Sequence, residues 1–396
     1  MNSFNFRNEE LSERERRNLL ILESLRRHGP LSRPEISQDI GLNVVTVSNY
    51  IDEQIKRNLV FEKELDVSEG GRRPVLLDLN ASAGYAIGVG LNLLNVVGVL
   101  MDLKGNILTK TSLERPGAHV KEIVDCILQV IREILRRAKE QAPDIKGIGV
   151  GIAGLVNKKD SSVYWPERVG NNYVYASVNL PLKNLLEKEF GLPVIIENDA
   201  TSACFGEQWM GLEPEVKNII YMYSGVGCGI MLNGEVYTGL DGYAGELSIH
   251  NYKETNTFHC GLGNPCFLRR WEIDLGIRED FIKKQKRKPA EMSLKEIFNL
   301  AKNNDSIACE VLDLAAQRLG IKVAFLVNLL NPEVVVIGGG LEEAGEAFLN
   351  RIRDTVKDWA FRETTQNLNI TYSKLRENSV ACGAASLVVR GVFASI

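Results

Sequence analysis

Glu197, Asn198 and Asp199 directly follow an apolar, β-branched run at 194–196 and precede the small-residue segment 200–206. This pattern predicts a buried strand that presents polar groups at its C-terminal end, followed by a helix. In open α/β sheets, ligands bind beyond the carboxyl ends of strands. A carboxylate beside an amide can hold two neighbouring hydroxyl groups, and the carboxylate can also remove a proton from one of them. The alternative interpretation is an Asx turn that only caps the helix.

The elements around this stretch predict two similar α/β halves. The first half has a β-hairpin, a third strand, a long amphipathic helix and an apolar strand, at residues 86–102, 107–114, 120–141 and 145–156. The second starts near Val216 with strand, glycine turn and strand at 218–239, and it ends in the apolar run and glycines of 326–341. Two such halves indicate lobes that close on a cleft, with Asn198 and Asp199 between them.

Composition narrows the class of protein. The chain has 396 residues, 44% of them hydrophobic and 25% charged, with a net charge of −4. Two or three domains are expected at this length, and any nucleic-acid contact must come from a local basic patch. No signal peptide or membrane-spanning run is apparent, and the seven cysteines mostly stand singly in apolar segments. We therefore expect a soluble, reduced, cytoplasmic protein without membrane contact.

The N-terminal segment predicts three helices, at 12–28, at 33–41 after the capping residue Ser32, and at 44–58 after the capping residue Asn43. Apolar residues fall where the core of a helix-turn-helix needs them: Ile36, Ile40, Leu42, Val47, Ile51 and Leu59. Small and polar residues on the outer face of the third helix can meet base edges in a major groove. The candidate DNA contacts in the helices are Arg33, Asn43, Val45, Thr46, Asn49 and Tyr50.

Residues 59–80 predict strand, turn and strand, with Gly70-Gly71-Arg72-Arg73-Pro74 at the tip. The glycines let the loop approach a duplex closely, and Arg72 and Arg73 can enter a minor groove or pair with phosphates. Residues 1–80 are therefore predicted to form a winged helix-turn-helix domain that binds DNA. The alternatives are a plain three-helix structure and a winged domain that contacts protein.

Five segments carry a resemblance to the ROK family (repressors, open reading frames and kinases), and in particular to its winged-helix, sugar-responsive repressors. They are residues 68–80, 147–156, 194–207, 224–246 and 328–340. The resemblance implies that residues 81–396 adopt the two-lobed sugar-kinase/actin-like ATPase fold, which is ribonuclease H-like. It also implies a division between the lobes near 200–215 and a C-terminal helix that returns to the first lobe.

The resemblance also implies sugar contacts. The family's Asn-x-x-Trp segment corresponds to Asn172, with Tyr175 in place of the tryptophan, and its Asn-Asp pair is Asn198 and Asp199. The family's Gly-Glu-x-Gly-His glutamate is Glu246. Amides and carboxylates that fan over an aromatic ring suit a sugar.

Kinases of the family bind nucleotide phosphate and metal with an Asp-x-Gly-Gly-Thr loop, and this chain departs from it. Residues 90–95 read Gly-Leu-Asn-Leu-Leu-Asn, so the carboxylate is missing and side chains replace the paired glycines. A close approach of backbone amides to a triphosphate is then obstructed. Asp199, the family's catalytic base, has no phosphoryl donor, so we expect a vestigial base that binds sugar and a protein that is not an enzyme.

The family's structural zinc site, a histidine and three cysteines, is altered as well. Ile249 stands at the histidine position, and His250 follows it as a candidate for both the sugar and the metal. His250, His259, Cys260 and Cys266 supply the N₂S₂ ligands that a tetrahedral zinc site needs. The alternative is a glycine-rich loop that has lost its metal, so no cofactor is certain.

Together, these observations predict a DNA-binding transcriptional regulator, most simply a repressor of carbohydrate-metabolism genes. Its partners would be operator DNA, a monosaccharide effector and a second copy of the chain, as a homodimer or a tetramer. One alternative is an ATP-dependent sugar kinase with an appended DNA-binding domain. Another is a constitutive DNA-binding protein whose ligand pocket has decayed.

Overall fold

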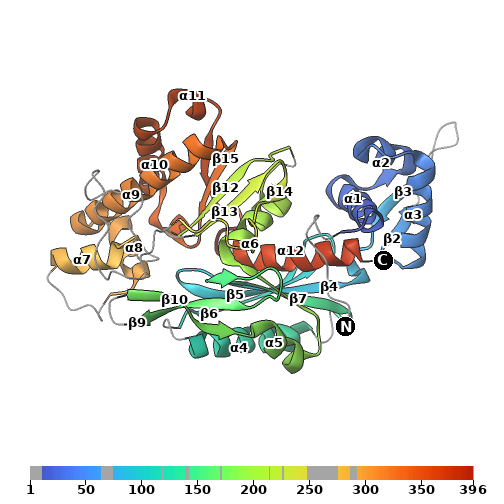
Figure 1. Ribbon diagram of the computed structural model, residues 1–396, viewed down its shortest axis with the longest axis horizontal. Helices are drawn as coiled ribbons and strands as arrows, with labels where there is room; N and C mark the ends of the chain where they lie inside the picture. Colours follow the sequence, from blue (N-terminus) through green and yellow to red (C-terminus); the bar gives the residue numbers. More distant parts are fainter. Residues whose placement is uncertain are drawn as a thin grey trace.

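The computed structural model describes residues 11–63, 75–116, 120–138, 142–169, 172–213, 215–224, 227–247, 275–285 and 292–395. Figure 1 shows a small N-terminal unit at one end of an elongated molecule, beside a larger part in which helices lie between and outside two sheets. Among the described residues, no helix combines the length and the apolar character needed to cross a bilayer.

The N-terminal unit contains three helices and a three-stranded sheet of order β1-β3-β2. Its elements are α1 (Glu13–His28), β1 (Leu31–Ser32), α2 (Arg33–Ile40), α3 (Val44–Lys56), β2 (Val60–Lys63) and β3 (Leu76–Leu79). Ser32 and Asn43 cap α2 and α3, as predicted, since each side chain accepts a hydrogen bond from a backbone N–H of the first turn. Gly41, in the left-handed region at φ 69°, ends α2.

The larger part contains two five-stranded sheets with the same topology. If the strands of each sheet are numbered in chain order, both have the order 3-2-1-4-5, with strands 1, 4 and 5 parallel. The first sheet contains β4 (Tyr85–Leu91), β5 (Asn95–Asp102), β6 (Ile107–Glu114), β7 (Ile145–Ile152) and β11 (Val194–Asn198). The second contains β12 (Ile219–Tyr223), β13 (Gly227–Leu232), β14 (Glu235–Val236), β15 (Val334–Gly338) and β16 (Asn369–Tyr372). The two similar halves predicted from the sequence are confirmed.

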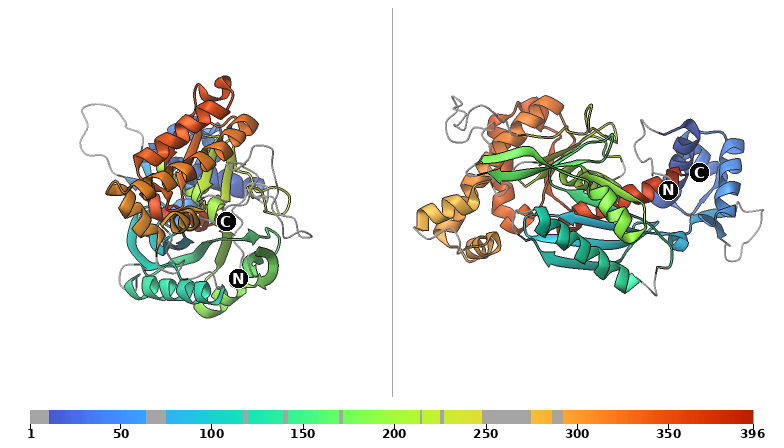
Figure 2. Two further views of the ribbon diagram at one scale, coloured as in Figure 1. Left: turned by 90° about the vertical axis from the view of Figure 1, so that its left-hand side faces the viewer. Right: turned by 60° about the horizontal axis from the view of Figure 1, so that its bottom comes forward.

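Helices cover the outer face of each sheet. Figures 1 and 2 show α4 (Val120–Ala138) and α5 (Leu182–Phe190) on the outer face of the first sheet, and α9 (Ser306–Leu330) and α10 (Glu346–Trp359) beside the second. The remaining elements are β8 (Leu155–Val156), β9 (Val163–Val169), β10 (Asn172–Leu180), α7 (Ile277–Gln285), α8 (Leu294–Lys302) and α11 (Arg362–Thr365).

Two helices lie between the sheets, α6 (Asp199–Gly206) and α12 (Ser379–Ala394) (Figure 1). Their close packing depends on glycines, because a Cβ atom at Gly149 of β7 would lie 2.0 Å from the Ala384 carbonyl oxygen of α12. A Cβ atom at Gly383 would lie 1.7 Å from the Ser202 carbonyl oxygen of α6. The glycines therefore let α12 lie directly on the first sheet and cross α6 at backbone contact.

Candidate functional site

Asn198 ends β11 and caps α6. Its side-chain oxygen accepts hydrogen bonds from the N–H groups of Ala200 at 2.9 Å and Thr201 at 3.2 Å, and its amide nitrogen donates to the Gly154 carbonyl at 3.1 Å. The helix-cap interpretation therefore describes this side chain, and one amide hydrogen is left for a ligand. The cap places Asp199 in the first turn of α6, beyond the carboxyl end of a parallel strand.

Asp199 is a buried carboxylate, only 5% exposed. Its Oδ1 accepts from the Ala200 N–H at 2.8 Å. Burial raises the pKa of Asp199 to about 6, against the opposing effects of the Ala200 N–H and of the Arg115 charge. Asp199 is thus mostly ionised at neutral pH, and it can accept hydrogen bonds from hydroxyl groups. The sequence indicated no role for Arg115, which follows β6 and is far from Asp199 along the chain.

The altered loop at 90–95 contacts the glycine turn that follows β15. The Leu93 N–H donates to the Gly339 carbonyl at 3.1 Å, and a Cβ atom at Gly340 would lie 3.2 Å from the Cβ of Leu93. Asn92 holds the loop shape, because its side-chain oxygen accepts from the N–H groups of Leu94 at 2.8 Å and Asn95 at 2.7 Å. The Asn92 side chain therefore stabilises the loop from within, and Leu93 packs against the glycine turn of the second sheet.

A buried carboxylate occupies the same glycine turn. The Gly340 N–H donates to Glu342 Oε2 at 2.8 Å. Burial raises the pKa of Glu342 to about 7, while backbone N–H groups act in the opposite direction. The Gly340 amide, which could otherwise meet an anion, is thus occupied by an acidic side chain.

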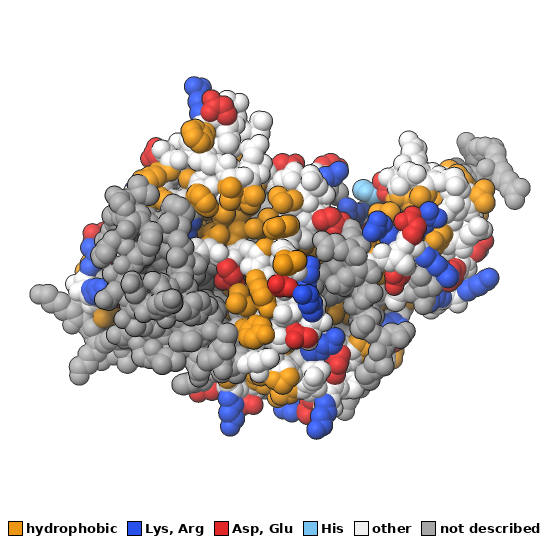
Figure 3. All heavy atoms as spheres, in the orientation of Figure 1, with side chains coloured by type: hydrophobic (Ala, Val, Ile, Leu, Met, Phe, Trp, Pro, Cys, Tyr) orange, Lys and Arg blue, Asp and Glu red, His pale blue; other side chains and the backbone are white. Residues whose placement is uncertain are grey.

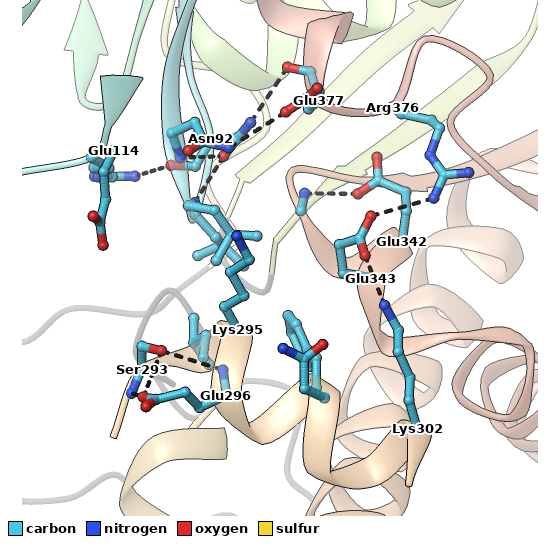
Figure 4. A pocket seen from close by; sticks show the side chains of 18 of the residues that line it. Asn92, Glu114, Ser293, Lys295, Glu296, Lys302, Glu342, Glu343, Arg376 and Glu377 are labelled. Carbon is cyan, nitrogen blue, oxygen red and sulfur yellow. Dashed lines mark hydrogen bonds and ion pairs between the residues drawn. The ribbon is translucent and has the colours of Figure 1, made fainter. Parts of the chain in front are cut away.

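A cavity of about 1090 Å³ opens beside this loop, between the two sheets and α8 (Figure 4). In Figure 4, Lys295 extends from α8 toward the loop that holds Asn92. Glu343, which also lines the cavity, bonds Lys302 at 2.9 Å and Arg376 at 3.4 Å. Described residues that line it include Asn92, Leu93, Asn95, Arg115, Lys295, Gly340, Glu342 and Arg376, and neither Asn198 nor Asp199 is among the described lining residues.

The structure describes the other predicted sugar and metal residues only in part. Glu246 is exposed and forms an isolated β-bridge with Gly227. Burial of the Cys228 thiol, and in second place the charge of Glu246, raise the pKa of that thiol to about 12. Asn172 starts β10, but its side chain and that of Tyr175 are outside the described part. The predicted metal ligands lie outside the described residues: His250, His259, Cys260 and Cys266. The described residues contain no group of three or more potential metal ligands.

The N-terminal unit presents α3 at its surface. Val45 is 72% exposed, Asn49 is exposed, and Thr46 is half-buried. Tyr50 is also half-buried, and its ring packs in part against the hydrophobic core. Two further predicted contacts have other partners: Asn43 Oδ1 accepts from the Thr46 N–H, and Arg33 lies 2.9 Å from Asp52 Oδ1 and 3.6 Å from Glu62 Oε1. Figure 3 shows acidic and basic side chains intermixed on this unit. Arg72 and Arg73 lie outside the described residues.

Comparison with known proteins extends these observations. A model of the ROK family matches residues 85–390. A putative xylose repressor from Caldicellulosiruptor sp. (strain Rt8B.4) is 32% identical over 95% of this chain and 96% of its own length. The DNA-binding transcriptional dual regulator NagC from Escherichia coli (strain K12) is 26% identical over 93% of this chain and 91% of its own.

Solved structures show the same fold. A ROK family transcriptional regulator, described as a homologue of the E. coli MLC protein, superposes with a TM-score of 0.73 at 23% identity and covers 96% of this chain and 97% of its own. A ROK family glucokinase from Streptomyces griseus, solved with glucose and AMPPNP, has a TM-score of 0.60 at 25% identity and covers 77% of this chain and 99% of its own. On the family match and on the similarity to the Caldicellulosiruptor protein along nearly the whole chain, this protein belongs to the ROK family.

Proposed function

We propose that this protein is a sugar-responsive transcriptional repressor. Its N-terminal unit binds operator DNA, and its two-lobed part binds a monosaccharide or a derivative of one. The observation that carries the proposal is the similarity to a putative xylose repressor over 95% of this chain and to a DNA-binding transcriptional dual regulator over 93% of it, N-terminal unit included. The structure of the S. griseus glucokinase covers only 77% of this chain, although this chain covers 99% of the kinase.

We assign the N-terminal unit to the winged helix-turn-helix class. The order of its elements supports the assignment: α2 and α3 are joined by a tight turn at Gly41, and β2 and β3 then form an antiparallel pair. In this class, the second helix of the motif enters the major groove, and Val45 and Asn49 lie on its exposed face. Two copies of the chain would read the two halves of an operator.

A role without phosphoryl transfer is supported by the loop at 90–95. Nucleotide phosphates need free backbone amides and a metal-binding carboxylate near the transferred group. Here Leu93 contacts Gly339 and Gly340, and Glu342 takes the Gly340 N–H. The Gly340 amide is therefore already occupied, and the Glu342 carboxylate in its ionised form would also repel phosphate oxygens.

The central test is a ligand panel applied to the full chain. A cognate sugar at a hundred times its dissociation constant is expected to stabilise the protein by about 2.7 kcal/mol, since it binds only the folded state. The panel contains hexoses, pentoses and N-acetyl sugars, and thermal unfolding is the measurement. A response to none of them would support the alternative of a constitutive DNA-binding protein and would contradict our proposal.

The same panel with ATP and Mg²⁺ is expected to yield no sugar phosphate above a protein-free blank. The physical reason is the missing phosphate cradle at 90–95. Turnover of about 1 s⁻¹ or faster, which is typical of enzymes, would instead establish the kinase alternative. Asp199→Asn is the control, because true turnover by this chain must disappear when the base is removed.

Replacing both Arg72 and Arg73 by alanine is expected to weaken DNA binding and to flatten its dependence on salt. If both arginines contact phosphates, the slope of log K against log [salt] falls in magnitude by about 2. Gel-shift titrations at several salt concentrations measure the slope. The matched control is the double variant Arg136→Ala and Arg137→Ala, an adjacent arginine pair on α4. An equal effect of both double variants would show that Arg72 and Arg73 are not part of the DNA-binding surface.

We also propose a structural zinc site. His250, His259, Cys260 and Cys266 have the donor types of a structural zinc site. Metal analysis of protein purified without chelators tests it, with Cys260→Ser and Cys266→Ser as the variants that should lose the metal.

A further inference from the structure

The N-terminal unit is joined to the two-lobed part through a specific buried contact. Trp209 lies in the π-helical turn η3 (Glu207–Gly211), which directly follows α6, and only 4% of its surface is exposed. Its indole N–H donates to Glu23 Oε1 of α1 at 2.7 Å. Figures 1 and 2 show the end of α12 beside α1 at this junction. A contact between residues 186 positions apart thus connects the two parts.

Cations surround the Glu23 carboxylate. The Arg26 guanidinium lies 3.8 Å above the centroid of the Trp209 ring, and its Nε donates to Glu23 Oε2 at 3.0 Å. The side chains of Arg26 and Glu23 are only 8% and 10% exposed. The side chain of Arg390 of α12 is 14% exposed, and loss of solvent lowers its pKa while Glu235 and Glu23 act in the opposite direction. Because hydrogen bonds and stacked rings depend on direction, this contact specifies one orientation of α1.

Trp209 and Asp199 of the candidate ligand site belong to one continuous helical segment. α6 begins at Asp199, and η3 follows it without a break, so Trp209 is about 15 Å along one helical rod from Asp199. Single π turns inside helices often occur at functional sites. A shift of α6 when a ligand binds Asp199 therefore moves the indole N–H relative to Glu23.

The other polar contacts described between the N-terminal unit and the two-lobed part involve different elements. Arg57 donates to the Ser395 carbonyl at 3.0 Å, at the end of α12, and Lys104 pairs with Asp78 at 2.8 Å, from the turn after β5. Neither contact involves α6. Of these three contacts, only that of Trp209 is made by a residue on the helical segment that carries Asp199.

We propose that Trp209 is a positioning residue that transmits occupancy of the Asn198–Asp199 site to the DNA-binding unit through its hydrogen bond to Glu23. This inference rests on the proposed function. Ligand binding changes the position of α6, the Trp209–Glu23 bond and Arg26 set the orientation of α1, and the orientation of α1 sets the spacing of α3 for DNA. The coupling is a difference in contact energy between two orientations, as allostery requires.

The test uses the full chain with Trp209→Phe, which keeps a buried ring beneath Arg26 and removes the N–H donor. DNA affinity is measured with and without saturating sugar, on a duplex that the wild-type protein enriched from a random pool. The sugar is the panel member that stabilises the wild-type protein most. We expect an unchanged thermal shift with sugar and a sugar-dependent change in DNA affinity that is about tenfold smaller than in the wild type.

Two further variants sharpen the test. Glu23→Gln keeps an acceptor for the indole and should retain more of the response than Glu23→Ala. Trp359→Phe, at the end of α10 and 42% exposed, is the matched control and should respond like the wild type.

An undiminished response in Trp209→Phe would overturn the inference and leave the proposed function intact. A wild-type protein that binds neither DNA nor sugar would overturn both. If Trp209→Phe does not fold, a second variant tests the inference. Trp165, Trp271 and Trp359 are replaced by phenylalanine, so that Trp209 is the only source of tryptophan fluorescence. Sugar must then change the emission of Trp209, and unchanged emission contradicts the inference.

Discussion

Replacing Asp199 with asparagine is expected to weaken sugar binding roughly 30- to 150-fold, because a charge-assisted hydrogen bond contributes about 2–3 kcal/mol. Asparagine keeps the size of the side chain and can still accept from the Ala200 N–H. The variant should therefore fold, keep its affinity for DNA and fail to respond to sugar. Isothermal titration with the sugar identified by the panel measures the loss.

The same substitution is expected to stabilise the protein near neutral pH. The pKa of Asp199 is raised from 3.8 to about 6, so the folded protein binds the proton more tightly than the unfolded chain. The stability that comes from this group is then fully present below pH 3.8 and is lost as the pH rises through about 6. At 1.36 kcal/mol per pKa unit, the loss amounts to about 3 kcal/mol at pH 7.

Urea unfolding of wild-type protein and Asp199→Asn between pH 4 and pH 8 tests this expectation. The difference between the two curves should be small at pH 4 and should reach about 3 kcal/mol above pH 7. Asp125→Asn, on the exposed side of α4, is the matched control and should leave both stability and sugar binding unchanged. If Asp199→Asn were less stable than the wild type at neutral pH, the buried ionised carboxylate inferred here would be wrong.

Local patterns predicted much of this fold because they depend on short-range physics. Ser32 and Asn43 marked helix starts, since a cap is a hydrogen bond between neighbours in the sequence. The two similar halves were predictable because strands, glycine turns and the long helix recur in the same order. Asn198 allowed two interpretations, and its hydrogen bonds now support the cap.

Contacts between distant segments were not predictable in this way. No periodicity indicates that Arg115 acts on Asp199, that Leu93 meets Gly339, or that Trp209 reaches Glu23. Each contact depends on how helices and sheets pack in three dimensions, and a single sequence carries no signal for it. The glycines of β7 and α12 are a partial exception, because a glycine inside a regular element indicates a close approach of backbone.

Gly383→Ala is expected to destabilise the protein by about 3 kcal/mol, as overpacking of a tight crossing does. Gly383 lies inside α12, and an added Cβ atom would lie 1.7 Å from the Ser202 carbonyl oxygen of α6. Across the crossing, a Cβ atom at Gly206 would lie 2.8 Å from the Gly383 nitrogen. Since both helices approach through glycine, no flexible side chain can yield, and the helices themselves must move apart.

Helix propensity makes this test discriminating, because alanine in a helix interior is favoured over glycine by about 1 kcal/mol. A gain in stability of that size, measured by urea unfolding, would show that α6 and α12 do not cross at backbone contact. Loss of stability is the expected result, and it should come with weaker sugar binding, because Ser202 and the Asn198 cap belong to the first turns of α6. The crossing that stabilises the domain therefore also holds Asp199 in place, and a change at Gly383, outside the ligand site, should reduce both.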